Sequence, residues 1–218
     1  MEKACVFAEH FNNILNSSSH EDAPPDPDPE PESWDQLTEM QQFLAQEPLV
    51  SEIEFCIQNL RSGRTAGEGG IAPEVLKAGG AEMVGWLHRM FSLVWASGKV
   101  PQAWKDSIII ALYKGAGDQA DCNKYRGISL LEVEGKVLAS ILARRALRFV
   151  DDQLLESQCG FRPRRCTTDA MFAVRRSCEL RWASGLDTYL CFIDLQKAFD
   201  SVDRPRLFQL LRRSGFPA

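Results

Sequence analysis

An aspartate placed directly after a short apolar segment is the clearest candidate for chemistry in this chain. Residues Thr188–Ile193 are apolar, β-branched or aromatic, which predicts a short buried strand with Asp194 at its end. A carboxylate there is costly to desolvate unless it is hydrogen-bonded, protonated or bound to a cation. Two more acids, Asp200 and Asp203, follow. A cation site at the strand end is one interpretation, and a turn or a helix cap is the other.

Phosphoryl transfer is the reaction that such a carboxylate would suit. Its charge builds up on non-bridging oxygens, and two cations about 3.5–4 Å apart stabilise the attacking and leaving oxygens. Magnesium is held by one or two carboxylates together with phosphate oxygens and water. A rigid strand would fix Asp194 in position for this task.

The charge of the chain is unevenly distributed. Residues 1–60 carry one lysine and thirteen acids, a net charge of −12, whereas residues 61–218 have a net charge of +7. A polyanion such as nucleic acid would bind the second segment. Solvated helix faces carry similar charge, so this excess alone leaves both interpretations open.

Composition excludes several classes of protein. The 218 residues are 44% hydrophobic and 25% charged, which is ordinary for a soluble chain of one or two domains. No segment approaches the roughly 20 apolar residues of a membrane span, and polar residues interrupt the N-terminus where a signal peptide would be apolar. The seven cysteines lack a Cys-x-x-Cys pair, which favours reduced, packed thiols over zinc. We expect an intracellular protein, in the nucleus, the cytoplasm or both.

The N-terminal third is predicted to be helical around one linker. Apolar spacing predicts a helix over 4–16, and residues 17–33 form an acidic, Pro-rich segment that we expect to be disordered. Ser51-x-x-Glu54 has the pattern of a capping box and predicts a helix over about 52–62. The glycine-rich residues 63–70 lack the Lys-Ser/Thr of a phosphate loop and predict a turn.

Two more helices are expected before the pattern changes to strands. Pro73 begins a short one that ends near Lys77, and a longer one covers 81–97. In the longer helix, one face is predicted to carry Trp86, Met90, Leu93 and Val94.

Two strands follow and predict a long-looped antiparallel hairpin. Residues 107–113 form an unbroken apolar run, typical of a strand buried on both faces, and residues 125–131 form the second strand. Lys114 and Arg126 would lie near the loop end of this hairpin.

The last third alternates helices with a basic loop. A helix over 134–150 is predicted to turn Val137, Leu138, Ile141 and Leu142 inward and Arg144, Arg145 and Arg148 outward. Residues 158–166 form the basic loop, with Arg162, Arg164 and Arg165. A helix capped by Thr167 or Thr168 ends near 184, and a final helix covers about 204–214.

Several motifs in order resemble the reverse transcriptases of LINE-type (non-LTR) retrotransposons. Phe192-x-Asp-Leu-x-Lys-Ala-Phe-Asp200 resembles the first catalytic motif, and Tyr125-Arg-Gly-Ile-Ser-Leu-Leu131 with Gly135-Lys136 resembles the fingers motif. Gln158-x-Gly-Phe-Arg162 with Thr167-Thr-Asp169 resembles the next element. The helix at 52–62 and the glycine loop are similar to the family's N-terminal extension.

The resemblance implies an α+β fold, an incomplete right-hand polymerase made of the fingers and part of the palm. Its expected organisation is a short helix at 1–16, the linker at 17–33, a helical extension to the fingers at 34–103, and fingers with the start of the palm at 104–218. Its partners would be an RNA template, a DNA primer and deoxynucleotides, with no membrane.

The resemblance also implies roles for single residues. Asp194 and the backbone carbonyl of Leu195 would bind catalytic Mg²⁺, and Phe199 would pack under the sugar of the incoming nucleotide and exclude a 2′-hydroxyl. Arg126, and Lys114 as a second contact, would bind the triphosphate. Arg162, Arg164 and Arg165 would follow the template backbone. Asp200 would hold local structure.

The chain departs from the family's pattern at three places. Gly69 stands where relatives usually have Asp, and Gly127 where many have Pro. No aromatic-x-Asp-Asp motif follows Asp194; Phe149-Val-Asp-Asp152 precedes it, at a helix end, and is not expected to be catalytic. We therefore expect the isolated chain, without that motif or a thumb, not to polymerise. The alternatives are a non-catalytic nucleic-acid-binding module and a poorly folded product of a decayed element.

Overall fold

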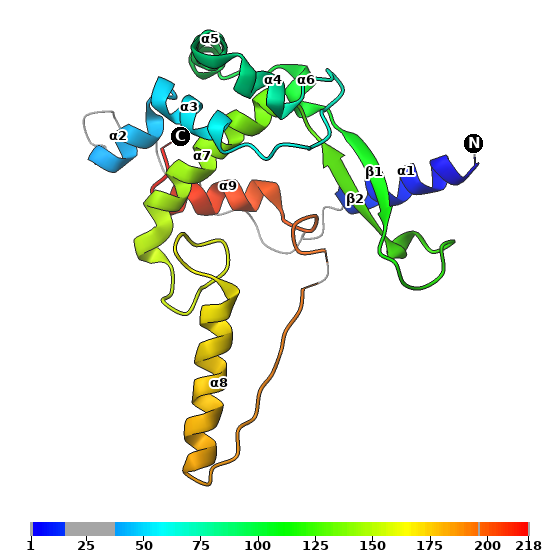
Figure 1. Cartoon of the computed structure of the whole chain (residues 1–218), viewed down its shortest axis with the longest axis vertical. Coiled ribbons are helices and arrows are strands. Elements are labelled where there is room, and N and C mark those ends of the chain that lie inside the picture. The colour runs from blue at the N-terminus through cyan, green and yellow to red at the C-terminus, as the bar shows by residue number, and fades with distance from the viewer. Residues whose placement is uncertain (1, 16–37, 196, 218) are drawn as a thin grey trace. The chain divides into compact units, whose positions relative to one another are not determined.

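The structure is a computed structural model that describes residues 2–15, 38–195 and 197–217. Helices predominate, with one two-stranded sheet (Figure 1). The chain divides into two compact units, which are described separately: residues 1–143 with 199–218, and residues 144–198. The linker predicted at 17–33 lies outside the described residues.

The predicted helices and the two hairpin strands are found with most ends within a few residues of those expected, whereas the helices at 39–45 and 102–105 were not predicted. The strands are β1 Ile108–Tyr113 and β2 Tyr125–Leu130. Within the described residues, the short 3₁₀ turns are η2 Cys122–Lys124 and η3 Asp151–Gln153. The helices are α1 Glu2–Leu15, α2 Glu39–Ala45, α3 Val50–Gln58, α4 Pro73–Ala78, α5 Gly80–Ser97, α6 Gln102–Lys105, α7 Val133–Val150, α8 Thr167–Ala183 and α9 Arg204–Arg213.

Four helices of the larger unit bury one apolar core. The core is formed by side chains from α3, α4, α5 and α7, and Trp104 of α6 packs at its edge. The ring centroids of Trp104 and Phe91 are 5.7 Å apart. On α5 the buried face carries Val84, Leu87 and Phe91, whereas Trp86 and Leu93 of the predicted face are exposed. The predicted face was therefore wrong in part. Since α5 is apolar around most of its circumference, the sequence pattern did not distinguish the two faces.

The inward face of α7 is confirmed at Val137, Leu138 and Ile141, which are all buried. Two predictions for this helix were wrong: Leu142 is 41% exposed, and Arg145 is only 2% exposed. Arg145 lies one turn after Ile141, so it continues the buried stripe of the helix.

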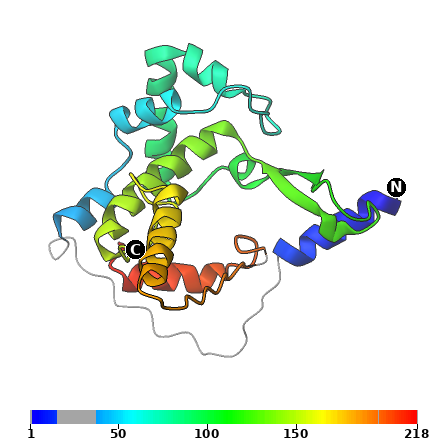
Figure 2. The same cartoon turned by 60° about the horizontal axis from the view of Figure 1, so that its bottom comes forward.

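The antiparallel hairpin is confirmed, with Tyr113 opposite Tyr125 and Ile108 opposite Leu130. Burial of β1 on both faces was wrong, because its apolar residues from Ile108 to Leu112 are largely exposed. A two-stranded sheet has few neighbours to cover it. One helix, α1, lies beside the hairpin in both views (Figures 1 and 2), and the ring of Phe7 meets that of Tyr125 edge to face at 4.8 Å.

Both predicted helix caps are shifted by a few residues. The Leu49 N–H donates to Glu52 Oε2 at 2.9 Å at the start of α3, in place of the Ser51–Glu54 pair. The Cys166 N–H donates to Asp169 Oδ2 at 2.8 Å at the start of α8, in place of a threonine cap. In each case the helix begins earlier than predicted, and the acid in its third position satisfies the free N–H.

The predicted strand at 188–193 is not formed in the smaller unit. These residues have no strand assignment, and Tyr189, Phe192 and Ile193 are each more than 80% exposed. A strand needs a neighbour to pair with, and the sheet that the described residues form contains only β1 and β2. Of the helices described, none combines the length and the apolar character that crossing a membrane requires.

Candidate nucleotide and nucleic-acid interface

The loop of the hairpin is closed by its own hydrogen bonds. The Lys114 N–H donates to the Lys124 carbonyl at 2.8 Å, and the Lys114 Nζ donates to the Asn123 carbonyl at 2.7 Å. The Tyr125 hydroxyl donates to the Gln119 carbonyl at 3.0 Å. The ammonium group of Lys114 is thus placed at the loop end, as predicted, where it already holds the loop backbone.

An aspartate begins the 3₁₀ turn that completes this loop. Asp121 Oδ1 accepts hydrogen bonds from the Asn123 backbone N–H at 2.9 Å and from Asn123 Nδ2 at 3.0 Å. These bonds, the backbone one above all, lower the pKa of the Asp121 carboxyl group. The charged carboxylate therefore stabilises the loop conformation.

Arg126 lies on the face of the hairpin opposite to α1. A Cβ built at Gly127 would lie 2.9 Å from Phe11 Cε1, so position 127 faces α1. Successive side chains of a strand alternate between the two faces, which turns Arg126 away from that helix. It is exposed opposite Leu112 and has no ion pair among the described residues. The close approach of Phe11 also explains why glycine occupies position 127.

Two of the three arginines in the basic loop have acidic partners. Arg162 Nε lies 2.8 Å from Asp151 Oδ1, and its guanidinium also donates to the carbonyls of Asp151 and Leu155. Arg165 pairs with Glu156, which raises the pKa of the arginine. Arg164 is exposed, with a positive φ of 60° and no ion pair in the part of the chain described. Template contact stays a prediction for all three.

The acids of Phe149-Val-Asp-Asp152 have a structural explanation. They begin the 3₁₀ turn η3 that follows α7, and Asp151 binds Arg162 through its carboxylate and its carbonyl. The motif thus lies at the end of a helix, as the sequence predicted, and its lack of a catalytic role stays a prediction.

Asp194 and Leu195 lie in the smaller unit, and Phe199 lies in the larger one. All three are exposed. No group of three or more potential metal-binding side chains occurs within the described ranges, so Asp194 by itself does not make a magnesium site. Asp203 has a defined role: its Oδ1 accepts from the Arg206 N–H at 3.0 Å and caps α9.

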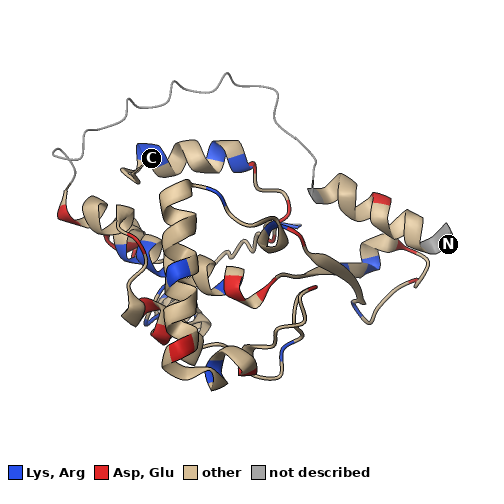
Figure 3. Ribbon diagram, turned by 90° about the horizontal axis from the view of Figure 1, so that it is seen from above, with Lys and Arg blue, Asp and Glu red and all other residues tan. Residues whose placement is uncertain are grey.

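Basic side chains are concentrated on α9 in the larger unit. This helix carries Arg204, Arg206, Arg212 and Arg213, and their positions appear as blue bands near the C-terminus in Figure 3. Sequence reasoning gave these arginines no role. The high arginine content of residues 204–213 is the signal that would have identified them.

Two buried acids near the glycine loop were also missed. Glu132 and Glu134 are 6% and 5% exposed, and the Gly69 N–H donates to Glu132 Oε1 at 2.6 Å. A Cβ at Gly67 would lie 2.7 Å from the same oxygen. The glycine loop therefore packs tightly onto Glu132. The signal in the sequence was two acids that interrupt an apolar segment just after the second strand.

Comparison with known proteins identifies the family. Residues 114–218 match the family model described as reverse transcriptase (RNA-dependent DNA polymerase). The chain is 36% identical, over 71% of its length, to a putative 115 kDa protein in the type-1 retrotransposable element R1DM of Drosophila melanogaster. It is 27% identical over 75% of its length to the RNA-directed DNA polymerase from mobile element jockey of the same species, and 25% identical over 94% to that of Drosophila funebris.

The chain spans only 15%, 18% and 22% of the length of these three relatives. The matched family segment contains Lys114, Arg126, Asp194 and Phe199. The chain therefore belongs to the reverse transcriptase family of non-LTR retrotransposons, with the family match at residues 114–218.

Proposed function

We propose that this chain is the fingers and the first palm segment of a right-hand polymerase that copies RNA into DNA. The observation that carries the proposal is the family match over 114–218, which contains the motif around Asp194. The proposed boundaries are a helical extension at 34–103 and the fingers and partial palm at 104–218. The proposed location is inside the cell, in the nucleus, the cytoplasm or both.

Asp194 is proposed to bind catalytic Mg²⁺ in the complete polymerase, with the Leu195 carbonyl as a second ligand. Bound magnesium would supply positive charge to the developing phosphate oxygens. Asp194 offers an exposed carboxylate, and the other ligands would come from outside the residues described here. The test is primer extension by the full parent protein: Asp194→Asn should abolish it, and Asp203→Asn, which affects a helix cap, should not.

Arg126, with Lys114, is proposed to bind the triphosphate of the incoming deoxynucleotide. Arg126 supports this role because it is exposed and has no ion pair with described residues. Arg126→Ala should raise the KM for deoxynucleotides, and Lys114→Ala should do so less, because Lys114 Nζ also binds the Asn123 carbonyl. Phe199→Ala should raise the incorporation of ribonucleotides, which primer extension with each nucleotide type would measure.

We also propose that the isolated 218-residue chain does not polymerise. Among the described residues, Asp194 belongs to no group of three or more potential metal-binding side chains, which supports this proposal. DNA synthesis by the purified chain that disappears with Asp194→Ala would overturn it.

A non-catalytic nucleic-acid-binding module is the second candidate function. Arg126 and Arg164, which have no ion pair among the described residues, favour it, as does the arginine-rich helix α9. Binding of RNA would weaken steeply with salt and would be unchanged by Asp194→Ala. If binding needs Asp194 and magnesium, the polymerase proposal is favoured over this one.

A further inference from the structure

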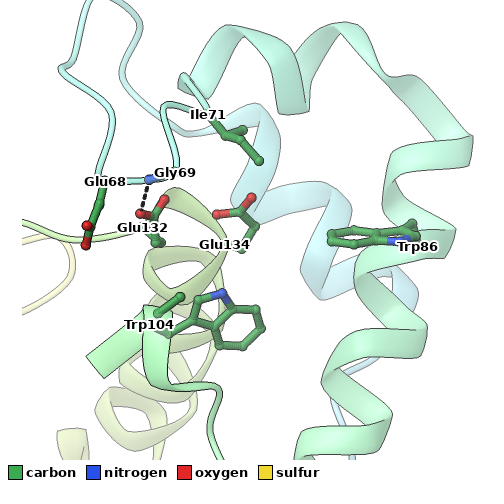
Figure 4. Close-up of a pocket in the computed structure, with 8 residues that line it drawn as sticks. Glu68, Gly69, Ile71, Trp86, Trp104, Glu132 and Glu134 are labelled. Carbon is green, nitrogen blue, oxygen red and sulfur yellow. Dashed lines mark hydrogen bonds between the residues drawn. The ribbon is translucent and has the colours of Figure 1, made fainter. Parts of the chain in front are cut away.

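A hollow of about 350 Å³ lies in the larger unit, between the glycine loop, α5, α6 and the start of α7. It is lined by Glu68, Gly69, Ile71, Trp86, Ala103, Trp104, Glu132 and Glu134. Figure 4 shows that the two tryptophan rings and the acidic side chains surround the same space. Its volume is within the range of small-ligand sites.

Glu134 is the feature that points to a ligand. Its side chain lines the hollow and is nearly buried, at 5% exposure, with its carboxylate directed toward that of Glu132 (Figure 4). Glu132 accepts the Gly69 N–H. Glu134, in contrast, has no hydrogen bond or ion pair with any residue in the described part of the chain. Among the described residues, every fully buried side-chain oxygen has a hydrogen-bond partner. The Glu134 oxygens have none, so they must keep a small accessible surface. Because Glu134 lines the hollow, we take this surface to face it.

Two nearly buried carboxylates that face one space repel each other. Their position at the start of α7 offsets part of this repulsion, because the helix N-terminus carries partial positive charge. Only Glu132 gains a hydrogen bond there. A cation in the hollow would provide Glu134 with the partner that it lacks.

The walls of the hollow favour an organic cation over a metal ion. Trp86, Trp104 and Ile71 would contact an apolar stem, and an indole ring attracts an adjacent cation. The described residues contain no group of three metal-binding side chains, and the tryptophan and isoleucine walls offer no oxygen ligand, so the hollow suits an organic cation better than a divalent ion. We propose that this hollow binds an alkyl guanidinium or ammonium group, with Glu134 and Glu132 as its counter-ions and Trp86 and Trp104 as its walls.

Such a group could come from an arginine side chain of a peptide or from a free amine. The test uses the intact 218-residue chain and follows the indole N–H signals of its tryptophans by NMR, assigned with single Trp→Phe variants. The probes are Nα-acetylarginine amide, agmatine and Nα-acetylcitrulline amide. The citrulline compound has nearly the shape of the arginine compound but carries no charge.

Both cationic probes should shift the Trp86 and Trp104 signals with a saturable dependence on concentration. The signal of Trp182, which is 84% exposed in the other unit, should not move. The citrulline compound should bind at least tenfold more weakly. Tighter binding of the arginine compound would identify a peptide side chain as the source, and tighter binding of agmatine a free amine.

Glu134→Gln should weaken the binding of both cations at least tenfold. Because Glu134 has no hydrogen bond or ion pair with a described residue, the change breaks no described contact, and circular dichroism should show an unchanged fold. Glu82→Gln, at an exposed acid on α5, is the matched control and should bind normally. Trp86→Ala, a partly exposed wall residue, is a second variant that should weaken binding while both acids remain. Equal binding of the citrulline compound, or normal binding by Glu134→Gln, would overturn the proposal.

Discussion

In residues 1–143 and 199–218, eleven apolar side chains from four helices form a continuous core, whereas no described apolar residue between 144 and 198 is buried. The smaller unit is instead held by ion pairs and helix caps, such as Arg162–Asp151 and Cys166–Asp169. Its large apolar side chains, including Trp182, Tyr189 and Phe192, face outward. The larger unit thus has the burial that an independent fold requires, and the smaller one has an apolar surface that a further segment or partner could cover.

The largest expected difference between the two units is in the free energy of unfolding that is lost when one phenylalanine of each unit is changed to alanine. Phe91 is completely buried against Trp104, so Phe91→Ala should lower the free energy of unfolding by about 3–5 kcal/mol. Phe192 is 85% exposed, so Phe192→Ala should change it by less than about 0.5 kcal/mol. Urea denaturation followed by circular dichroism measures both. Equal losses would mean that residue 192 is packed in solution and would remove the contrast between the units.

A second pair of variants tests how tightly the larger unit is packed around its glycine loop. Gly67→Ala would place a Cβ 2.7 Å from Glu132 Oε1 and 2.9 Å from its backbone nitrogen, and should cost about 1–3 kcal/mol. Gly85→Ala is the matched control, since it lies within α5 with open space around it. That change should stabilise the protein by about 0.5–1 kcal/mol. If both variants behave alike in urea denaturation, the loop does not pack on Glu132.

The sequence predicted most of what depends on local pattern. The helices other than α2 and α6, the hairpin and the placement of Lys114 and Arg126 at its loop end follow from periodicity and turn residues within short segments. The faces of α5 and α7 were predicted only in part, because burial depends on which helices pack against them. Arg145 and Glu134 were missed for the same reason: a charged residue at a buried position cannot be distinguished by type from one in solvent.

The candidate site shows the same limit. Motif order identified the family and the residues to consider, but the strand before Asp194 was predicted from composition alone. Residues 188–193 have the residue types of a strand and lack, among the described residues, the neighbour that would pair with them. Gly69 was noted as a departure without a reason; a Cβ at this position would lie only 3.2 Å from Glu132 Oε2, and this close approach supplies one.

A smaller loss of stability is expected within the smaller unit when Arg162, which binds η3 to the basic loop, is replaced. Arg162 is largely buried and binds Asp151 and the Leu155 carbonyl, so Arg162→Ala should cost about 1–2 kcal/mol of local stability. The neighbouring Arg164→Ala removes an exposed side chain and should change little. Hydrogen exchange at residues 151–165 would report the difference. Protection that is equal in both variants would show that the ion pair does not hold this loop.

The smallest expected effect is a loss of local stability at acid pH, which should differ between the two units. The pKa of Asp169 is lowered because its carboxylate accepts the Cys166 N–H, and that of Glu74 because its carboxylate accepts the Gly63 N–H. A lowered pKa in the folded state means that each carboxylate stabilises the fold above its unfolded pKa, about 3.9 for Asp. This stabilisation is lost as the pH falls through the folded pKa.

The first turn of α8 should therefore fray below about pH 4, since no buried residue of that helix holds it in place. The first turn of α4 should persist, because Pro73 and Leu76 are buried. Amide exchange measured between pH 6 and pH 3, corrected for the intrinsic rate at each pH, would compare the two turns. In Asp169→Asn the α8 turn should be equally open at every pH, while the α4 turn keeps its wild-type behaviour. If both turns open together on acidification, core burial does not protect α4, and the two units do not differ in the way proposed.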